Sequence, residues 1–126
     1  GCAAAIAALD VIKEENLIER AADLGGYFIE RLWEFEKRYE LIGDIRGKGL
    51  FIGVEFVKDR TTKEPAIEEA VRIRYEMKNR GVLVVSGSGY LGNVLRILAP
   101  VVITREQIDK CIEAFDGSLK AVGKAM

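Results

Sequence analysis

The sequence predicts an α+β fold, in which a small, mostly antiparallel sheet of about four strands carries helices packed on one face. Apolar residues recur with helical spacing before Leu41 and after Thr104, whereas between Leu41 and Val57 they alternate as in strands. The pattern along the whole chain indicates the element order α-α-β-β-α-β-β-α. A length of 126 residues allows one core and is too short for two ordinary domains, so we expect residues 1–126 to form one domain.

The first predicted helix covers Cys2 to Glu14. This segment is rich in alanine, and Ile6, Leu9 and Ile12 recur on one face. Alanine favours helix, and its small side chain allows another element to approach closely. We therefore expect a helix with one side suited to tight packing.

A second, longer helix is predicted to start at Asn16, which with Glu19 resembles a capping box. Two glycines in its interior, Gly25 and Gly26, each lower helix propensity by about 1 kcal/mol relative to alanine. We interpret them as a close crossing or a slight bend. The apolar stripe of this helix comprises Leu17, Ala21, Leu24, Phe28, Leu32, Phe35 and Tyr39.

Two strands are predicted on either side of a glycine turn, Gly47-Lys48-Gly49. Glu55 lies on the second of these strands. We expect it to pair across the sheet with Arg46 or Arg96 as an ordinary structural ion pair.

The central part of the chain predicts a polar loop at residues 58–64 and then a helix. Pro65 suits the first turn of that helix, and Gly81 is expected to end it. The apolar residues expected on the helix are Ile67, Ala70, Val71 and Met77.

A buried strand is predicted at residues 82–85, followed by a flexible loop from Ser86 to Gly92. Residues 87–92 match the letters of a dinucleotide-binding fingerprint, but phosphate binding there requires a helix to begin within the motif. Because residues 93–98 continue as a strand, we expect no nucleotide site. Thr104 and Gln107 form a capping box for the last helix, whose predicted inward residues are Ile108, Cys111, Ile112, Phe115, Leu119 and Val122.

One charged residue, Arg96, interrupts the apolar strand that leads to Pro100. An unpaired ion inside a protein costs several kcal/mol. Arg96 therefore extends into water, pairs with a surface glutamate, or receives a carboxylate or phosphate from a ligand. The planar fork of arginine matches both oxygens of a carboxylate, which makes Arg96 the candidate anchor for a substrate carboxylate.

The composition argues against several classes of function. The net charge of −1 with both signs interspersed predicts no nucleic-acid partner, and no apolar run approaches the length of a membrane helix. Without histidine there is no His-based triad and no His metal ligand, so we expect no metal site. No lysine is expected to be desolvated enough to form an imine; those considered are Lys13, Lys48, Lys58, Lys63, Lys78, Lys110, Lys120 and Lys124.

Two features bear on the environment of the protein. Cys2 and Cys111 lie on apolar helical faces, where buried reduced thiols are expected, as in the cytoplasm. The single glutamine and many Glu, Lys, Arg and Ile residues favour a thermophile.

Three blocks of the sequence resemble the C-terminal part of class III aminotransferases. They are Gly1-Cys2-Ala3-Ala4-Ala5 through Leu9-Asp10-Val11-Ile12, Leu41 to Leu50 with Gly53-Val54-Glu55, and Asn93-Val94-Leu95-Arg96 with Ala99-Pro100. The family contains pyridoxal-phosphate enzymes of fold type I, among them 4-aminobutyrate, acetylornithine and ornithine aminotransferases. The resemblance covers essentially the whole chain.

The resemblance implies that residues 1–126 are the small C-terminal domain of a longer enzyme, with residues 1–14 as a helix linking to a large domain. That large domain would supply the imine-forming lysine and bind pyridoxal phosphate, and a homodimer would complete the active site. Arg96 would bind the substrate carboxylate. We expect the 126-residue chain alone to bind no cofactor, to be inactive, and to expose an apolar patch on its first helix.

The implied activity is transfer of an amino group from 4-aminobutyrate, or another ω-amino or ornithine-like acid, to 2-oxoglutarate. An alternative within the same family is an amino-acid racemase. A third possibility, from a different class, is a free-standing module for small-ligand binding or oligomerisation.

Overall fold

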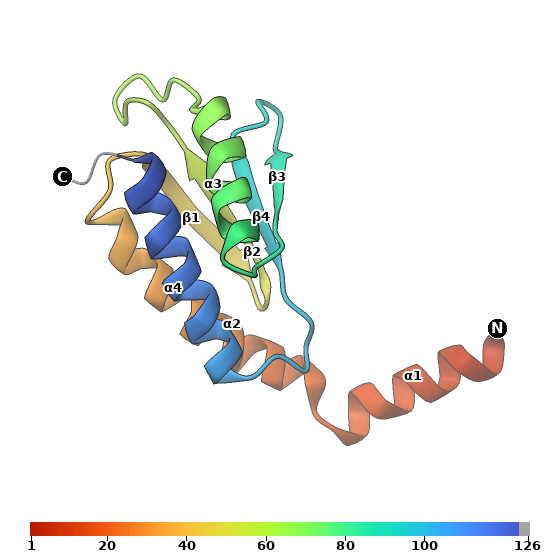
Figure 1. Cartoon of the computed structure of the whole chain (residues 1–126). Helices are drawn as coiled ribbons and strands as arrows, with labels where there is room; N and C mark the ends of the chain where they lie inside the picture. The colour runs from red at the N-terminus through yellow and green to blue at the C-terminus, as the bar shows by residue number, and fades with distance from the viewer. Residues whose placement is uncertain (124–126) are drawn as a thin grey trace.

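A computed structural model describes residues 1–123 and has the predicted order of elements (Figure 1). The elements are α1 (Cys2–Glu14), α2 (Leu17–Glu36), β1 (Ile42–Lys48), β2 (Phe51–Phe56), α3 (Ile67–Asn79), β3 (Val85–Ser88), β4 (Val94–Leu98) and α4 (Arg105–Val122).

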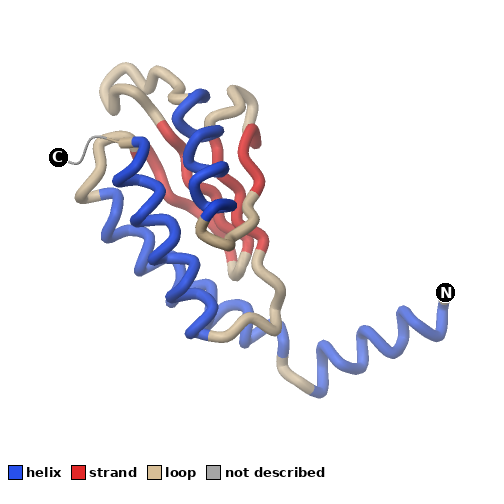
Figure 2. Tube along the Cα trace, viewed as in Figure 1, coloured by secondary structure: helices blue, strands red, loops and turns tan. Residues whose placement is uncertain are grey.

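The four strands form one antiparallel sheet in the order β1-β2-β4-β3. Helices α2, α3 and α4 lie on one side of it, and the other side is open (Figure 2). The turn between β1 and β2 contains Gly49, whose φ of +57° favours glycine. The predicted α+β architecture is confirmed.

The core lies between the sheet and these three helices. Alternation along β2 sends Ile52, Val54 and Phe56 to the helix side, where all three are fully buried. In the helix layer, Phe35 of α2 and Phe115 of α4 meet edge to face, with ring centroids 5.5 Å apart. The core therefore lies on the helix-covered side of the sheet, and helices α2, α3 and α4 do not cover the opposite face.

The glycine pair in α2 marks a close crossing, as predicted. A Cβ atom built on Gly25 would lie 2.0 Å from the carbonyl oxygen of Gly49, whereas a Cβ on Gly26 would meet nothing within 4 Å. Gly25 thus allows α2 to touch the β1–β2 turn.

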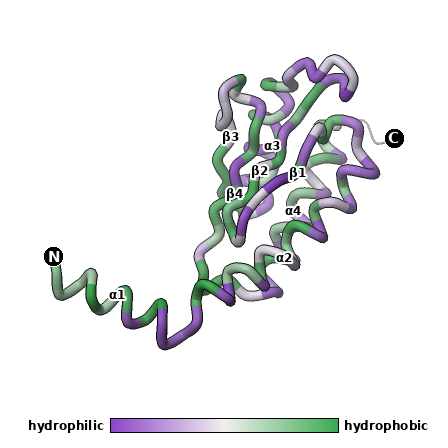
Figure 3. The backbone as a smooth tube through the Cα atoms, turned by 180° about the vertical axis from the view of Figure 1, so that it is seen from behind, coloured by the Kyte–Doolittle hydropathy of each residue, from purple (hydrophilic) through white to green (hydrophobic). Residues whose placement is uncertain are grey.

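Helix α1 projects away from the rest of the chain (Figure 3). None of its residues is buried, and Ile6 and Leu9 are 60% and 56% exposed. The predicted exposed apolar patch is confirmed. Among the described residues, no helix is both long enough and apolar enough to cross a membrane.

The predicted start of α2 at Asn16 is confirmed, but its capping box was wrong, and so was the place of Pro65 in the first turn of α3. Asn16 makes no side-chain capping bond to α2 and has a left-handed backbone with φ of 50°. Pro65 precedes α3 because it forms a bridge with Val57, and the N–H of Ala66 donates to the carbonyl of Phe56. These contacts keep the chain extended beside β2 until Ile67. The capping box of Thr104 and Gln107 on α4 is confirmed.

The strand predicted at residues 82–85 was also wrong. Gly81, with φ of +84°, ends α3 as expected, but the next three residues cross from the helix layer to the sheet. Leu83 is 82% exposed, and pairing with β4 starts only at Val85, opposite Arg96. Part of the predicted flexible loop is therefore the edge strand β3.

The two cysteines differ, which corrects the expectation that both are buried. Cys2 is exposed because α1 does not pack on the core, whereas Cys111 is buried in α4. Burial raises the pKa of the Cys111 thiol to about 11.

We expect Gly25→Ala to destabilise the 126-residue chain by about 1–3 kcal/mol, since its methyl group would overlap a backbone oxygen. Gly26→Ala is the matched control and should stabilise it by about 0.5–1 kcal/mol. Chemical denaturation measures both. Equal effects of the two substitutions would contradict the crossing.

We expect one thiol of the native chain to react rapidly with a thiol-reactive disulfide at pH 8. At that pH a thiol with a pKa of about 11 is thiolate in only about one molecule in a thousand, so Cys111 should react only after unfolding. Cys2→Ser should abolish the fast phase. Rapid loss of two thiols from the folded chain would contradict this prediction.

Candidate functional site

The open face of the sheet carries most of the polar strand residues. Phe51, Gly53 and Glu55 alternate with the buried residues of β2 and therefore point to this side. Gly53 pairs with Arg46 on β1 and with Arg96 on β4. The register thus places the two arginines in one cross-strand row, separated by a residue without a side chain.

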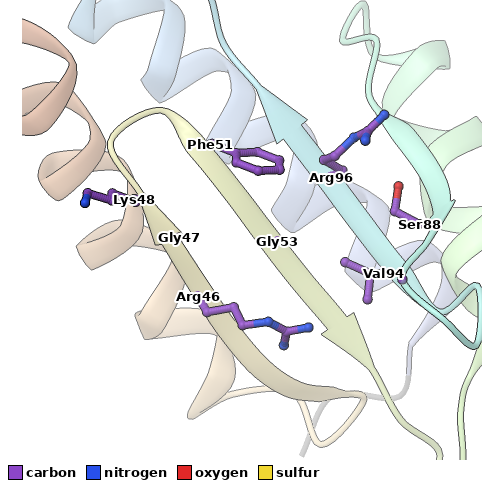
Figure 4. A pocket seen from close by; sticks show the side chains of 9 residues that line it. Arg46, Gly47, Lys48, Phe51, Gly53, Ser88, Val94 and Arg96 are labelled. Atoms are coloured by element: carbon purple, nitrogen blue, oxygen red, sulfur yellow. The ribbon is translucent and has the colours of Figure 1, made fainter. Parts of the chain in front are cut away.

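A hollow of about 340 Å³ lies on this face, between β1 and β3 (Figure 4). Gly53 leaves space at its floor, and Ser88 contributes a hydroxyl from the edge strand. The lining residues are Arg46, Gly47, Lys48, Phe51, Gly53, Ser88, Gly89, Val94 and Arg96.

Arg96 is half-buried at the wall of this hollow and is not paired with an acid among residues 1–123. Its Nε atom is buried and has no hydrogen-bond partner in the described part of the chain. The guanidinium points away from Arg46 (Figure 4). Of the situations expected from sequence, pairing with a surface glutamate is not observed.

Arg46 is in a different electrostatic state. Its Nη1 atom lies 2.5 Å from a carboxylate oxygen of Asp44 and 2.8 Å from one of Glu55. The hydrogen bonds to Asp44 and Glu55 raise the pKa of the Arg46 guanidinium above its ordinary value. The predicted structural pairing of Glu55 is confirmed, with Arg46 as its partner.

The glycine loop before β4 closes one end of the hollow. Gly87, Gly89 and Gly92 all have positive φ, and the side chain of Tyr90 at the tip is fully exposed. β4 starts at Val94, so the loop leads into a strand, as predicted. The buried Asn93 side chain donates to the carbonyl of Phe56 at 2.7 Å and fixes the start of β4.

Sequence reasoning identified Arg96 but missed the other residues that shape the hollow. Ser88 was assigned to a loop, Lys48 was considered as an imine-forming lysine and set aside, and Gly53 was not assigned to a site. The strict alternation along β2 indicates which of its residues face outward. The register with β1 and β4, which the sequence does not show, decides which of them are neighbours.

The family model for class III aminotransferases matches residues 1–119. The chain belongs to the class III aminotransferase family. It is 46% identical over 116 residues to alanine–glyoxylate aminotransferase 2 homolog 2 of Arabidopsis thaliana, covering 92% of this chain and 24% of that protein. It is 42% identical over 119 residues to the leucine/methionine racemase of Thermococcus litoralis, covering 94% of this chain and 26% of that protein.

A solved structure gives the same result. The amine transaminase of an uncultivated Pseudomonas species, in a pyridoxal-phosphate-bound form, matches with a TM-score of 0.87 and 34% identity. The match covers 97% of this chain and 27% of that one. This member of the class III aminotransferase family therefore spans about a quarter of the length of these three relatives.

The family implies pyridoxal phosphate, but the described residues do not form a complete site for it. An imine requires a desolvated lysine, and every lysine in residues 1–123 is exposed, including Lys48 at the hollow; Lys124 lies outside the described residues. The carboxylates of Asp44 and Glu55 are both bound to Arg46. Within the described range, no three His, Cys, Asp or Glu side chains form a possible metal site.

Proposed function

We propose that this chain is the C-terminal small domain of a pyridoxal-phosphate-dependent class III enzyme, in which Arg96 binds the carboxylate of the substrate. The observation that carries this proposal is a half-buried guanidinium at a hollow, whose Nε atom has no hydrogen-bond partner and which forms no ion pair within residues 1–123. A carboxylate is the ligand whose geometry and charge satisfy such a group.

The remainder of the site would come from a large domain of the same polypeptide. The large domain would lie over the open face of the sheet, where Arg96 is accessible, and α1 would connect it to the small domain. Pyridoxal phosphate, which acts as an electron sink in amino-acid chemistry, would be held by the large domain. The enzyme would function as a homodimer, and the 126-residue chain alone would be inactive.

The proposed reaction is transfer of an amino group from 4-aminobutyrate or another ω-amino acid to 2-oxoglutarate. Both compounds carry a carboxylate, so one anchor on β4 can orient the donor and then the acceptor. The substrates named for the Arabidopsis relative, alanine and glyoxylate, also carry one each. Family membership favours this assignment over a free-standing binding or oligomerisation module.

A racemase is the second candidate, because 94% of this chain aligns with the racemase from Thermococcus litoralis at 42% identity. Arg96 would hold the amino acid in the same way. A racemase, however, leaves the amino group on its carbon, removes the α-proton and returns a proton to the opposite face, so it needs no keto-acid acceptor.

In the full-length enzyme, Arg96→Gln should raise the KM for the amino-acid donor about 10- to 100-fold. The substitution removes a charge-assisted bidentate contact worth about 1.5–3 kcal/mol. Arg96→Lys keeps the charge without the fork and should give a smaller increase. Steady-state kinetics measures the effect, and an unchanged KM in Arg96→Gln would refute the assignment of Arg96.

The two candidate reactions differ in their dependence on an acceptor. The transferase should consume the donor only when 2-oxoglutarate or a similar keto acid is present. To test this, the full-length enzyme is incubated with one enantiomer of an amino acid and no keto acid, and the amino acid is then analysed by chiral chromatography. Inversion of the enantiomer under those conditions would establish the racemase instead.

A further inference from the structure

Glu55 lies on β2, the strand between those that carry the two arginines of the open sheet face. It is directly opposite Asp44 on β1 and Val94 on β4. Arg46 and Arg96 are each two residues further along these neighbouring strands, on the same face. Diagonal positions of this kind are within reach of long side chains. The register therefore makes both arginines possible partners for Glu55.

Glu55 binds only one of them in the described chain. Its carboxylate lies 2.8 Å from Arg46 Nη1, and it forms no ion pair with Arg96. The same Nη1 atom contacts Asp44, which faces Glu55 across the strand pair. Because two like charges directly opposite each other are destabilising, Arg46 relieves a repulsion that would otherwise act on Glu55.

Loss of Arg46 would change the partner of Glu55. The carboxylate would still be repelled by Asp44, and Arg96 would be the remaining arginine of the hollow. The Glu55 carboxylate would then pair with the guanidinium of Arg96, which the substrate carboxylate requires. An internal carboxylate of this kind acts as a competitive ligand, because it is always present beside the site.

We infer that Arg46 is a positioning residue: by holding Glu55, it keeps Arg96 unpaired and available to the carboxylate of the substrate. This inference rests on the proposed role of Arg96. Arg46 acts through Glu55, whose carboxylate its Nη1 atom contacts. Its removal should therefore act on KM for carboxylate-bearing substrates more than on kcat.

The first test measures KM for the amino-acid donor in the full-length enzyme. Arg46→Gln should raise this KM about three- to fivefold, because an exposed ion pair between Glu55 and Arg96 would compete with the substrate by about that factor. The double variant Arg46→Gln/Glu55→Gln should reverse that increase, since the competing carboxylate is gone. If Arg46→Gln leaves KM unchanged, or if the double variant does not reverse the rise, the inference is overturned.

Arg38→Gln is the matched control. Arg38 is as exposed as Arg46, with side chains 51% and 55% exposed, and it pairs with Asp116 at 3.2 Å. It lies outside the hollow, so its loss should not change KM. An equal rise in KM in Arg38→Gln would show that the effect of Arg46→Gln comes from a general loss of charge, and would overturn the inference.

A second test uses the 126-residue chain and needs no activity. The Nε–Hε resonance of Arg96, identified by its loss in Arg96→Gln, should shift in Arg46→Gln and return in Arg46→Gln/Glu55→Gln. If Arg46→Gln does not fold, Asp44→Asn/Arg46→Gln removes the facing charge, still frees Glu55, and should give a smaller shift in the same direction. An unshifted resonance in the folded variant overturns the inference.

The two proposals fail in different ways. An unchanged KM in Arg96→Gln refutes the assignment of Arg96, whatever the NMR spectra show. A raised KM in Arg96→Gln, combined with no effect of Arg46→Gln, leaves the proposed function in place and refutes only the role of Arg46.

Discussion

The pairing of β2 with both β1 and β4 is the interaction on which the rest of the structure depends. It makes β2 a central strand, whose alternate residues are fully buried on one side and open on the other. The helices cover the buried side because the apolar side chains of the strands are concentrated there. The open side is consequently the face of the sheet on which charged residues can gather at low cost.

The electrostatics of the open face follow from the register of these strands. Gly53 separates Arg46 from Arg96, while Asp44 and Glu55 lie near Arg46. One arginine is therefore neutralised by two acids and the other has no acidic partner in the described chain. The difference between the paired Arg46 and the unpaired Arg96 within residues 1–123 comes from neighbours on adjacent strands, since both residues have the same chemistry.

Several features were predictable because they depend on local sequence. Alternation, turn glycines and the Thr104 capping box act over a few residues, so β1, β2, β4 and α4 were predicted correctly. Arg96 stood out because a charge interrupted an apolar strand. The failures involve distant contacts: Pro65 pairs with Val57, and residues 82–84 must cross between layers before Val85 can join β4. Cys2 was misassigned because helical periodicity does not show whether a partner covers the face.

The sequence by itself determined the class of the fold, the order of its elements and the presence of one arginine that requires an anion. The spacing of apolar residues and the residues that form turns are local properties of the sequence. Burying an unpaired charge costs free energy wherever its strand lies in the fold. Only the tertiary structure decided which acid belongs to which arginine. That choice depends on strand order and register, which bring Glu55 within reach of both Arg46 and Arg96. Glu55 pairs with Arg46, whose Nη1 atom also contacts Asp44 and so offsets the repulsion between the two carboxylates.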